Sequence, residues 1–235
     1  MRMLLLSNST CYQKGYLEHA MGDLRDFLGE SVKKVMFVPY AGVTISWDTY
    51  TKKVRERYAE IGYELESVHE TSDAAAAVRE AEAIAVGGGN TFYLLQSMYE
   101  NGIVEPMRER VASGVPFMGW SAGSNVVCPT IRTTNDMPIV EPKTFDALGL
   151  VKFQINPHYT DAVLPQHQGE TRADRIAEFV KANPDVSVVG LREGGILRVE
   201  GDSMSLLGEK DMLLFRGGRK TAEYKPGDSL DFLLG

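Results

Sequence analysis

Cysteine and histidine are scarce in this 235-residue sequence, and long apolar runs are absent. The two cysteines, Cys11 and Cys128, are far apart and do not form a disulfide framework, which favours a reducing, cytoplasmic setting. The apolar run at residues 3–6 is too short for a signal peptide, and no stretch of about 18 apolar residues could span a membrane. We therefore expect a cytoplasmic protein without a membrane partner.

Positive charge is also in short supply. The sequence has 25 lysines and arginines against 32 aspartates and glutamates, a formal net charge of -7. Because an acidic surface repels phosphate backbones, we expect no nucleic-acid partner. Hydrophobic residues make up 43% of the chain, enough for a sizeable core. The length fits one α/β domain over residues 1–235.

Short apolar runs alternate with amphipathic stretches in the first half of the sequence. The runs predict strands at residues 3–6, 35–38, 63–68, 83–86 and 115–118, and the stretches predict helices at 16–28, 47–61 and 104–112 and after the capping residues Asp73 and Asn90. This alternation predicts a mostly parallel α/β sheet with helices on both faces. Chemistry in such sheets gathers at the carboxyl ends of the strands.

The pattern of alternating strands and helices changes after Ala122. Residues 129–150 have little periodicity and predict a long loop, followed by strands at 153–156 and 186–191 with a helix at 171–182 between them. Short alternating runs then follow at residues 196–199, 203–207 and 212–215. We expect these runs to form an antiparallel C-terminal appendage on the edge of the main sheet.

The segment Gly119-Trp120-Ser121-Ala122-Gly123 has the pattern G-x-S-x-G directly after a predicted strand. In a nucleophile elbow this pattern forms a sharp, strained turn that exposes the serine oxygen, and its glycines let strand and helix approach closely. The N–H of Ala122, at the start of the next helix, could then stabilise an oxyanion. The same pattern also fits a glycine-rich turn with a capping serine.

A second glycine-rich segment, Gly87-Gly88-Gly89-Asn90, lies between a predicted strand and a helix. Backbone N–H groups here, that of Gly88 among them, could supply the other half of an oxyanion hole. A phosphate-binding loop uses the same physics, so a non-catalytic anion-binding module of flavodoxin-like fold is an alternative. The glycine spacing of dinucleotide-binding and P-loop motifs is absent, which favours acyl transfer.

A serine nucleophile needs a general base, and His158 is the best placed of four histidines. It follows the strand predicted at 153–156, so it lies at a strand carboxyl end, where Pro157 fixes the chain direction. We interpret the other three as structural, surface or loop residues: His19, His69 and His167.

The base in turn needs a carboxylate that orients it. Asp136 would give the order Ser, Asp, His of the α/β-hydrolases. Glu193 follows the strand predicted at 186–191, so its strand-end position matches those of Ser121 and His158. Spacing alone does not decide which of the two carboxylates orients His158.

The sequence resembles the peptidase E family of α-aspartyl dipeptidases over nearly its whole length. The stretches that carry the resemblance are residues 4–10, 41–44, 86–92, 119–123, 129–140, 155–158 and 169–172. The run Thr133-Thr134-Asn135-Asp136-Met137-Pro138-Ile139-Val140 is far more specific than any G-x-S-x-G pattern. The resemblance implies a flavodoxin-like sheet related to the class I glutamine amidotransferases.

The resemblance also implies an activity and its residues. It implies hydrolysis of dipeptides with an N-terminal aspartate (Asp-X), without metal or cofactor. The implied catalytic residues form a Ser–His–Glu triad of Ser121, His158 and Glu193, and Asp136 becomes a pocket or structural residue. Asn90 belongs to the same expected substrate pocket.

An aspartyl substrate carries a carboxylate into a pocket of an acidic protein. Because burying that charge without a partner costs several kcal/mol, the pocket needs a cation. Arginine meets a carboxylate bidentately, and we expect Arg172 to do so, with Arg132 as second choice. The alternative is an exposed ion pair between Arg172 and Glu170.

Other functions remain open on the sequence. One is a different acyl hydrolase of the same fold, such as a cyanophycinase-like peptidase or an esterase, and the pocket charge would discriminate it, since an esterase needs no cation for the acyl side chain. Neither Cys11 nor Cys128 occupies an elbow, so a cysteine hydrolase is not favoured. The expected assembly is a monomer or a homodimer.

Overall fold

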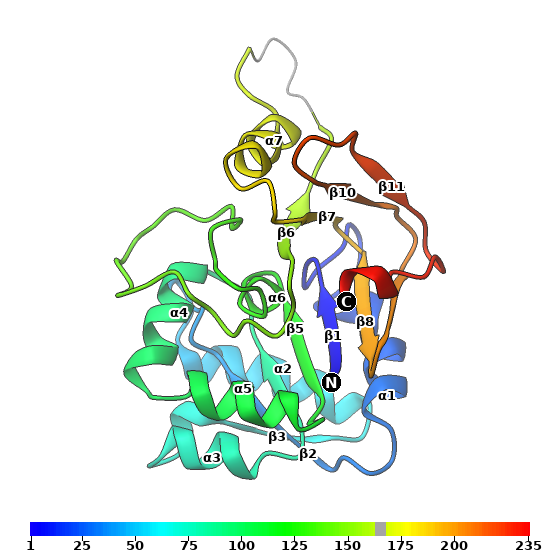
Figure 1. Ribbon diagram of the computed structural model, residues 1–235. Coiled ribbons are helices and arrows are strands. Elements are labelled where there is room, and N and C mark those ends of the chain that lie inside the picture. Colours follow the sequence, from blue (N-terminus) through cyan, green and yellow to red (C-terminus); the bar gives the residue numbers. More distant parts are fainter. Residues whose placement is uncertain (163–167) are drawn as a thin grey trace.

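A seven-stranded sheet forms the centre of the computed structural model, which describes residues 1–162 and 168–235 (Figure 1). The strand order is β3-β2-β4-β5-β1-β8-β9. Its strands are β1 (Arg2–Leu6), β2 (Lys34–Val38), β3 (Glu64–Ser67), β4 (Ile84–Val86), β5 (Phe117–Trp120), β8 (Ile196–Glu200) and β9 (Ser203–Leu207). The first five are parallel to one another, β8 pairs antiparallel with β1, and β9 pairs antiparallel with β8 at the edge. The predicted mostly parallel, flavodoxin-like sheet is confirmed.

Helices cover both faces of this sheet. On one face, α1 (Met21–Leu28) and α2 (Trp47–Glu60) pack against Leu4, Phe37 and Trp120. The other face is covered by α3 (Ala74–Glu80), α4 (Thr91–Glu100) and α5 (Val104–Ala112). Burial on both faces explains why β1, β2, β4 and β5 have continuous apolar runs, whereas the edge strand β3 alternates between exposed and buried residues.

A second, four-stranded sheet has the order β11-β10-β7-β6. Its strands are β6 (Gln154–Tyr159), β7 (Val188–Arg192), β10 (Met212–Phe215) and β11 (Ala222–Tyr224). Helix α7 (Arg172–Ala182) connects the parallel strands β6 and β7, and in Figure 1 this unit lies above the large sheet. Residues 212–215 are thus not on the edge of the main sheet, because β10 pairs with β7 through Leu213 and Gly190.

Local capping signals set several helix ends as predicted. The side chains of Ser46, Asp73 and Asn90 each accept a hydrogen bond from the backbone N–H three residues on. Helix α1 begins later than the expected residue 16, because Leu17 adopts a positive φ of 57° and only a short 3-10 turn precedes Met21. The predicted helix start is thus correct where a side chain caps it and wrong at α1, where a positive φ at Leu17 delays the helix.

The long loop predicted at residues 129–150 is present, and it is tied down at both ends. Thr130 and Asp146 form an isolated antiparallel bridge. From α5, Arg108 donates hydrogen bonds to the carbonyls of Ala147 and Leu148 at 3.0 and 2.8 Å. The loop therefore has a fixed path. None of the helices in the described ranges is long and apolar enough to cross a membrane.

Candidate active site

The turn between β5 and α6 (Ala122–Asn125) presents Ser121 in a strained backbone conformation, with φ 56° and ψ -114°. The flanking glycines are required by close contacts. A Cβ on Gly119 would lie 2.3 Å from the carbonyl oxygen of Gly123, and one on Gly123 would lie 2.1 Å from that of Val86. The elbow geometry expected from G-x-S-x-G is confirmed. Helix α6, which starts at Ala122 as predicted, is short and ends at Asn125.

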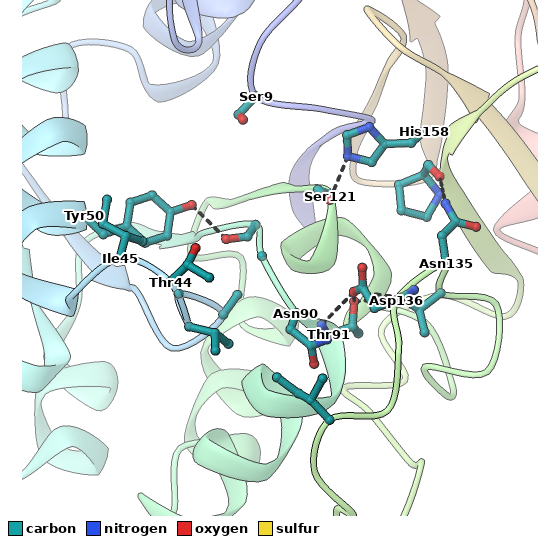
Figure 2. A pocket seen from close by; sticks show the side chains of 18 of the residues that line it. Ser9, Thr44, Ile45, Tyr50, Asn90, Thr91, Ser121, Asn135, Asp136 and His158 are labelled. Carbon is teal, nitrogen blue, oxygen red and sulfur yellow. Dashed lines mark hydrogen bonds between the residues drawn. The ribbon is translucent and has the colours of Figure 1, made fainter.

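Ser121, His158 and Glu193 form a hydrogen-bonded chain, the first link of which is drawn in Figure 2. Ser121 Oγ lies 2.9 Å from His158 Nε2, and His158 Nδ1 lies 2.7 Å from Glu193 Oε1. Because a carboxylate only accepts hydrogen bonds, Nδ1 carries the proton and Nε2 is free to accept from the serine hydroxyl. The contact between Glu193 and His158 expected from the sequence is present.

An irregularity in β6 aims His158 at Ser121. The pairing of β6 with β7 shifts register between Asn156 and Tyr159, and His158 has a positive φ of 53°. Such conformations are unfavourable for residues other than glycine, and they concentrate at functional sites. Glu193 directly follows β7, the parallel neighbour of β6, so the same sheet supplies both the histidine and its carboxylate.

Asp136 takes no part in the hydrogen bonds that join Ser121, His158 and Glu193, and it lies instead at the N-terminus of α4. Its Oδ2 accepts hydrogen bonds from the backbone N–H and hydroxyl of Thr91, at 2.7 and 2.6 Å, and from the hydroxyl of Thr134 at 3.0 Å. Asn90 caps α4 through Oδ1 and donates from Nδ2 to the carbonyl of Met137 at 2.8 Å. The segment around Asp136 is therefore fixed beside the glycine loop (Figure 2).

The glycine loop lies against the serine turn. A Cβ on Gly88 would lie 3.0 Å from Ser121 Cβ, and one on Gly89, whose φ is 142°, would lie 2.1 Å from the carbonyl oxygen of Ala41. Within the described part of the chain, the N–H groups of Gly88 and Ala122 donate to no backbone carbonyl. Both donors are therefore available to a bound ligand.

A cavity of about 810 Å³ opens over Ser121 and His158. Four further residues predicted from the sequence line it, namely Gly88, Asn90, Asp136 and Arg172. The sequence reasoning missed Ser9, Tyr16, Tyr50 and Lys53, which also line it. Tyr50 and Lys53 are three residues apart on α2 and so share a helix face, but nothing in the sequence shows that this face points to Ser121.

The model of peptidase family S51 matches residues 3–207, which includes all members of the hydrogen-bonded chain. The chain belongs to peptidase family S51. It is therefore a peptidase, and peptides are its substrates.

Relatives of this S51 peptidase match over nearly the whole chain. It is 50% identical to a protein named peptidase E from Nostoc sp., with 99% of this chain and 96% of the relative covered. It is also 50% identical to the peptidase E of Streptomyces coelicolor, covering 100% of this chain and 95% of the relative. A crystal structure of a peptidase from an acI-B1 actinobacterium aligns with a TM-score of 0.73 at 17% identity, covering 97% of this chain and 96% of that one. This last likeness shows the fold.

Arg172 of the S51 peptidase is half-buried at the start of α7. Burial, with a smaller contribution from Arg175, lowers its pKa, but a guanidinium remains charged at neutral pH. The alternative pair with Glu170 is not formed, because that carboxylate lies 3.9 Å from Arg175 instead. Arg132 packs over the ring of Phe179 and does not line the cavity, so the second choice is not favoured.

His19 and His69 of this S51 peptidase have no hydrogen bond to Ser121. His69 is not a surface residue, since its side chain is only 11% exposed and contacts Ser67 and Asp48. Burial lowers the pKa of His19, which lies in a short 3-10 helix, and His167 lies outside the described residues. No group of three histidine, cysteine, aspartate or glutamate side chains within residues 1–162 and 168–235 is placed to hold a metal ion.

Proposed function

We propose that this S51 peptidase hydrolyses dipeptides with an N-terminal aspartate, through an acyl-enzyme on Ser121. The observation that carries the proposal is the charge pattern of the cavity. Among its described lining residues, Asp136 is the carboxylate, and the cations are Lys53 and Arg172. An Asp-X dipeptide has the complementary set at neutral pH, with one ammonium group and two carboxylates.

The acyl half of the substrate pairs with Asp136 and Arg172. The free amine of the substrate binds Asp136, whose Oδ2 is already fixed by Thr91 and Thr134. The aspartyl carboxylate binds the guanidinium of Arg172, which meets it bidentately. Both side-chain ends of Asn90 are already hydrogen-bonded, so we assign it to holding the segment around Asp136.

The reaction follows from the hydrogen-bonded chain. His158 Nε2 takes the proton of Ser121 as the serine oxygen attacks the scissile carbonyl, and Glu193 stabilises the imidazolium that forms. The N–H groups of Gly88 and Ala122 stabilise the oxyanion of the tetrahedral intermediate. His158 then gives its proton to the leaving amine, and water, activated by the same imidazole, hydrolyses the acyl-enzyme.

The competing functions are less well supported. An esterase needs neither Arg172 nor Asp136 in its acyl pocket. The match to a peptidase family argues against a non-catalytic anion-binding module. We further propose one peptidase domain over residues 1–235, acting in the cytoplasm as a monomer or homodimer without metal or cofactor. The two free cysteines are compatible with a reducing compartment.

A dipeptide panel tests the proposal. Purified enzyme is given Asp-Leu, Asn-Leu, Glu-Leu and Ala-Leu, and free leucine is measured, with Ser121→Ala as the control for contaminating peptidases. We expect kcat/KM for Asp-Leu to exceed that for each of the others by at least about 100-fold, because each leaves a charged group of the pocket unmatched or misplaced. Cleavage of Ala-Leu as fast as Asp-Leu would refute the aspartyl specificity.

A further inference from the structure

Part of the cavity is left unused by the acyl half of an Asp-X substrate. In Figure 2, Ser9 and Tyr50 lie on one side of Ser121, and Asn135 and Asp136 lie on the other. All of them line the same cavity. If the acyl half lies toward Asp136, the leaving amino acid lies toward Ser9 and Tyr50.

Lys53 is held on this leaving-group side. It follows Tyr50 by three residues on α2, and its ammonium lies 3.9 Å from the centroid of the Tyr16 ring. The hydroxyl of Tyr16 lies 3.1 Å from that of Tyr50. A cation over an aromatic face is attracted by the ring quadrupole, so the Tyr16 ring keeps this charge at the cavity wall.

The ring beneath Lys53 is connected to the serine turn by a chain of hydrogen bonds. The indole N–H of Trp120 donates to the hydroxyl of Tyr50 at 3.0 Å, and that hydroxyl donates to the carbonyl of Gly88 at 3.1 Å. Trp120 directly precedes Ser121 in the sequence, and Gly88 lies against Ser121. The position of Lys53 is therefore tied to that of the nucleophile.

Lys53 is exposed on α2, and within the part of the chain that the structure describes its ammonium has no carboxylate partner. None of the ion pairs found among residues 1–162 and 168–235 includes it. In a chain with a formal net charge of -7, a cation at the wall of a cavity without a carboxylate partner points to an anionic ligand.

We propose that Lys53 binds the α-carboxylate of the leaving amino acid and thereby makes the enzyme selective for dipeptides. The inference rests on the proposed function, since it assigns the other half of the same cavity. In an Asp-X dipeptide only one Cα separates the scissile nitrogen from this carboxylate. In a longer peptide a neutral amide takes its place, and the ammonium gains no ionic partner.

The test compares Asp-Leu with Asp-Leu-amide, which differs only in the charge that Lys53 would bind. The wild-type enzyme should prefer the free acid by about 10- to 100-fold in kcat/KM, the range for a charged hydrogen bond. Lys53→Met keeps an unbranched side chain but removes the ammonium. It should lower kcat/KM for Asp-Leu by the same factor and leave that for the amide nearly unchanged.

Lys52→Met is the matched control, because Lys52 neighbours Lys53 on α2 but does not line the cavity. It removes the same net charge and should leave the preference intact. Lys53→Arg keeps a cation and should retain most of the preference, which separates loss of charge from loss of fold. Equal losses on both substrates in Lys53→Met, or a wild-type enzyme indifferent to the amide, would overturn the inference.

The proposed aspartyl specificity can fail separately. If the wild-type enzyme cleaves Ala-Leu as well as Asp-Leu, that specificity is wrong, but Ala-Leu and Ala-Leu-amide then provide the same comparison for Lys53. A preference for the free acid that survives Lys53→Met would refute the carboxylate site while leaving aspartyl specificity untouched. The two proposals thus give distinguishable results.

Discussion

The hydroxyl of Ser7 lies 2.9 Å from the backbone nitrogen of His158 and accepts its hydrogen bond. The same hydroxyl donates to the carbonyl of Leu191 at 2.7 Å. Ser7 is fully buried and follows β1 of the large sheet, whereas His158 and Leu191 belong to β6 and β7 of the smaller one. One buried side chain thus joins the large sheet to both strands that position the proposed base and its carboxylate.

Ser7→Ala should destabilise the protein and slow the reaction. It leaves the partly buried N–H of His158 and the buried carbonyl of Leu191 without their partner, which costs roughly 1–3 kcal/mol. Urea denaturation measures the free energy of unfolding, and steady-state kinetics should show a lower kcat with little change in KM. The control is Ser113→Ala, which removes an exposed hydroxyl and should stay within about 0.5 kcal/mol of wild type. Equal stability of the two variants would contradict this account.

Ser121→Ala should remove nearly all dipeptidase activity and leave the fold intact. Loss of a covalent nucleophile lowers turnover by about 10⁴-fold or more. A serine-directed fluorophosphonate should label the wild-type protein and not the variant, and circular dichroism checks the fold. Turnover close to wild type in the purified variant is incompatible with the proposed mechanism.

Glu193→Gln should lower kcat by at least about 100-fold with a small effect on KM. The amide can donate to His158 Nδ1 and so favours the tautomer that cannot accept the serine proton. Asp136→Asn is the comparison, and it should raise KM, because Asp136 lies in the pocket and not on the imidazole. If the two variants show the opposite pattern, Asp136 is the orienting acid and Glu193 is not.

Arg172→Met should weaken cleavage of Asp-Leu strongly and narrow its advantage over Asn-Leu. The neutral amide of asparagine gains little from a cation, so removing the charge affects it less. The measurement is kcat/KM for both substrates. Arg132→Met is the control, since Arg132 packs on Phe179 outside the cavity and should leave the ratio unchanged. An unaltered ratio in Arg172→Met removes Arg172 from the acyl pocket.

The two cysteines should differ in reactivity. Burial raises the pKa of Cys128 to about 12, whereas Cys11 is partly exposed. Because the thiolate is the reactive form, a raised pKa leaves Cys128 almost wholly protonated at pH 8. Titration with a thiol-specific disulfide reagent should count one thiol in the native protein and two in denaturant. Native Cys11→Ser that still reacts rapidly would contradict the burial of Cys128.

The helix starts and the serine elbow could be predicted from the sequence because each depends largely on residues close to it in the chain. Side-chain caps such as Ser46 and Asn90 act within one helical turn, so their effect is readable from neighbouring residues. The elbow around Ser121 is partly local, because Gly119 is required by its contact with Gly123, whereas Gly123 is required by its contact with Val86 on the neighbouring strand β4.

Features that depend on pairing between distant segments could not be predicted from the sequence. The run at residues 212–215 has the pattern of an edge strand, but which edge it joins depends on β7, more than 20 residues earlier. Spacing also left Asp136 and Glu193 open, and only the parallel pairing of β6 with β7 brings Glu193 to His158. The sequence did not predict Lys53 as a binding residue, because its position at the cavity depends on packing against the ring of Tyr16, which is distant in sequence.

The division of the strands into two sheets has a consequence for how this enzyme can be tuned. Ser121 follows β5 of one sheet, while His158 and Glu193 come from the other. The reacting atoms are therefore aligned by the seam between the sheets, and a misplacement of about 1 Å there can reduce turnover by 100-fold. Substitutions on β10 or β11 that shift the small sheet against the large one should therefore raise or lower turnover, although neither strand carries a residue of the catalytic site.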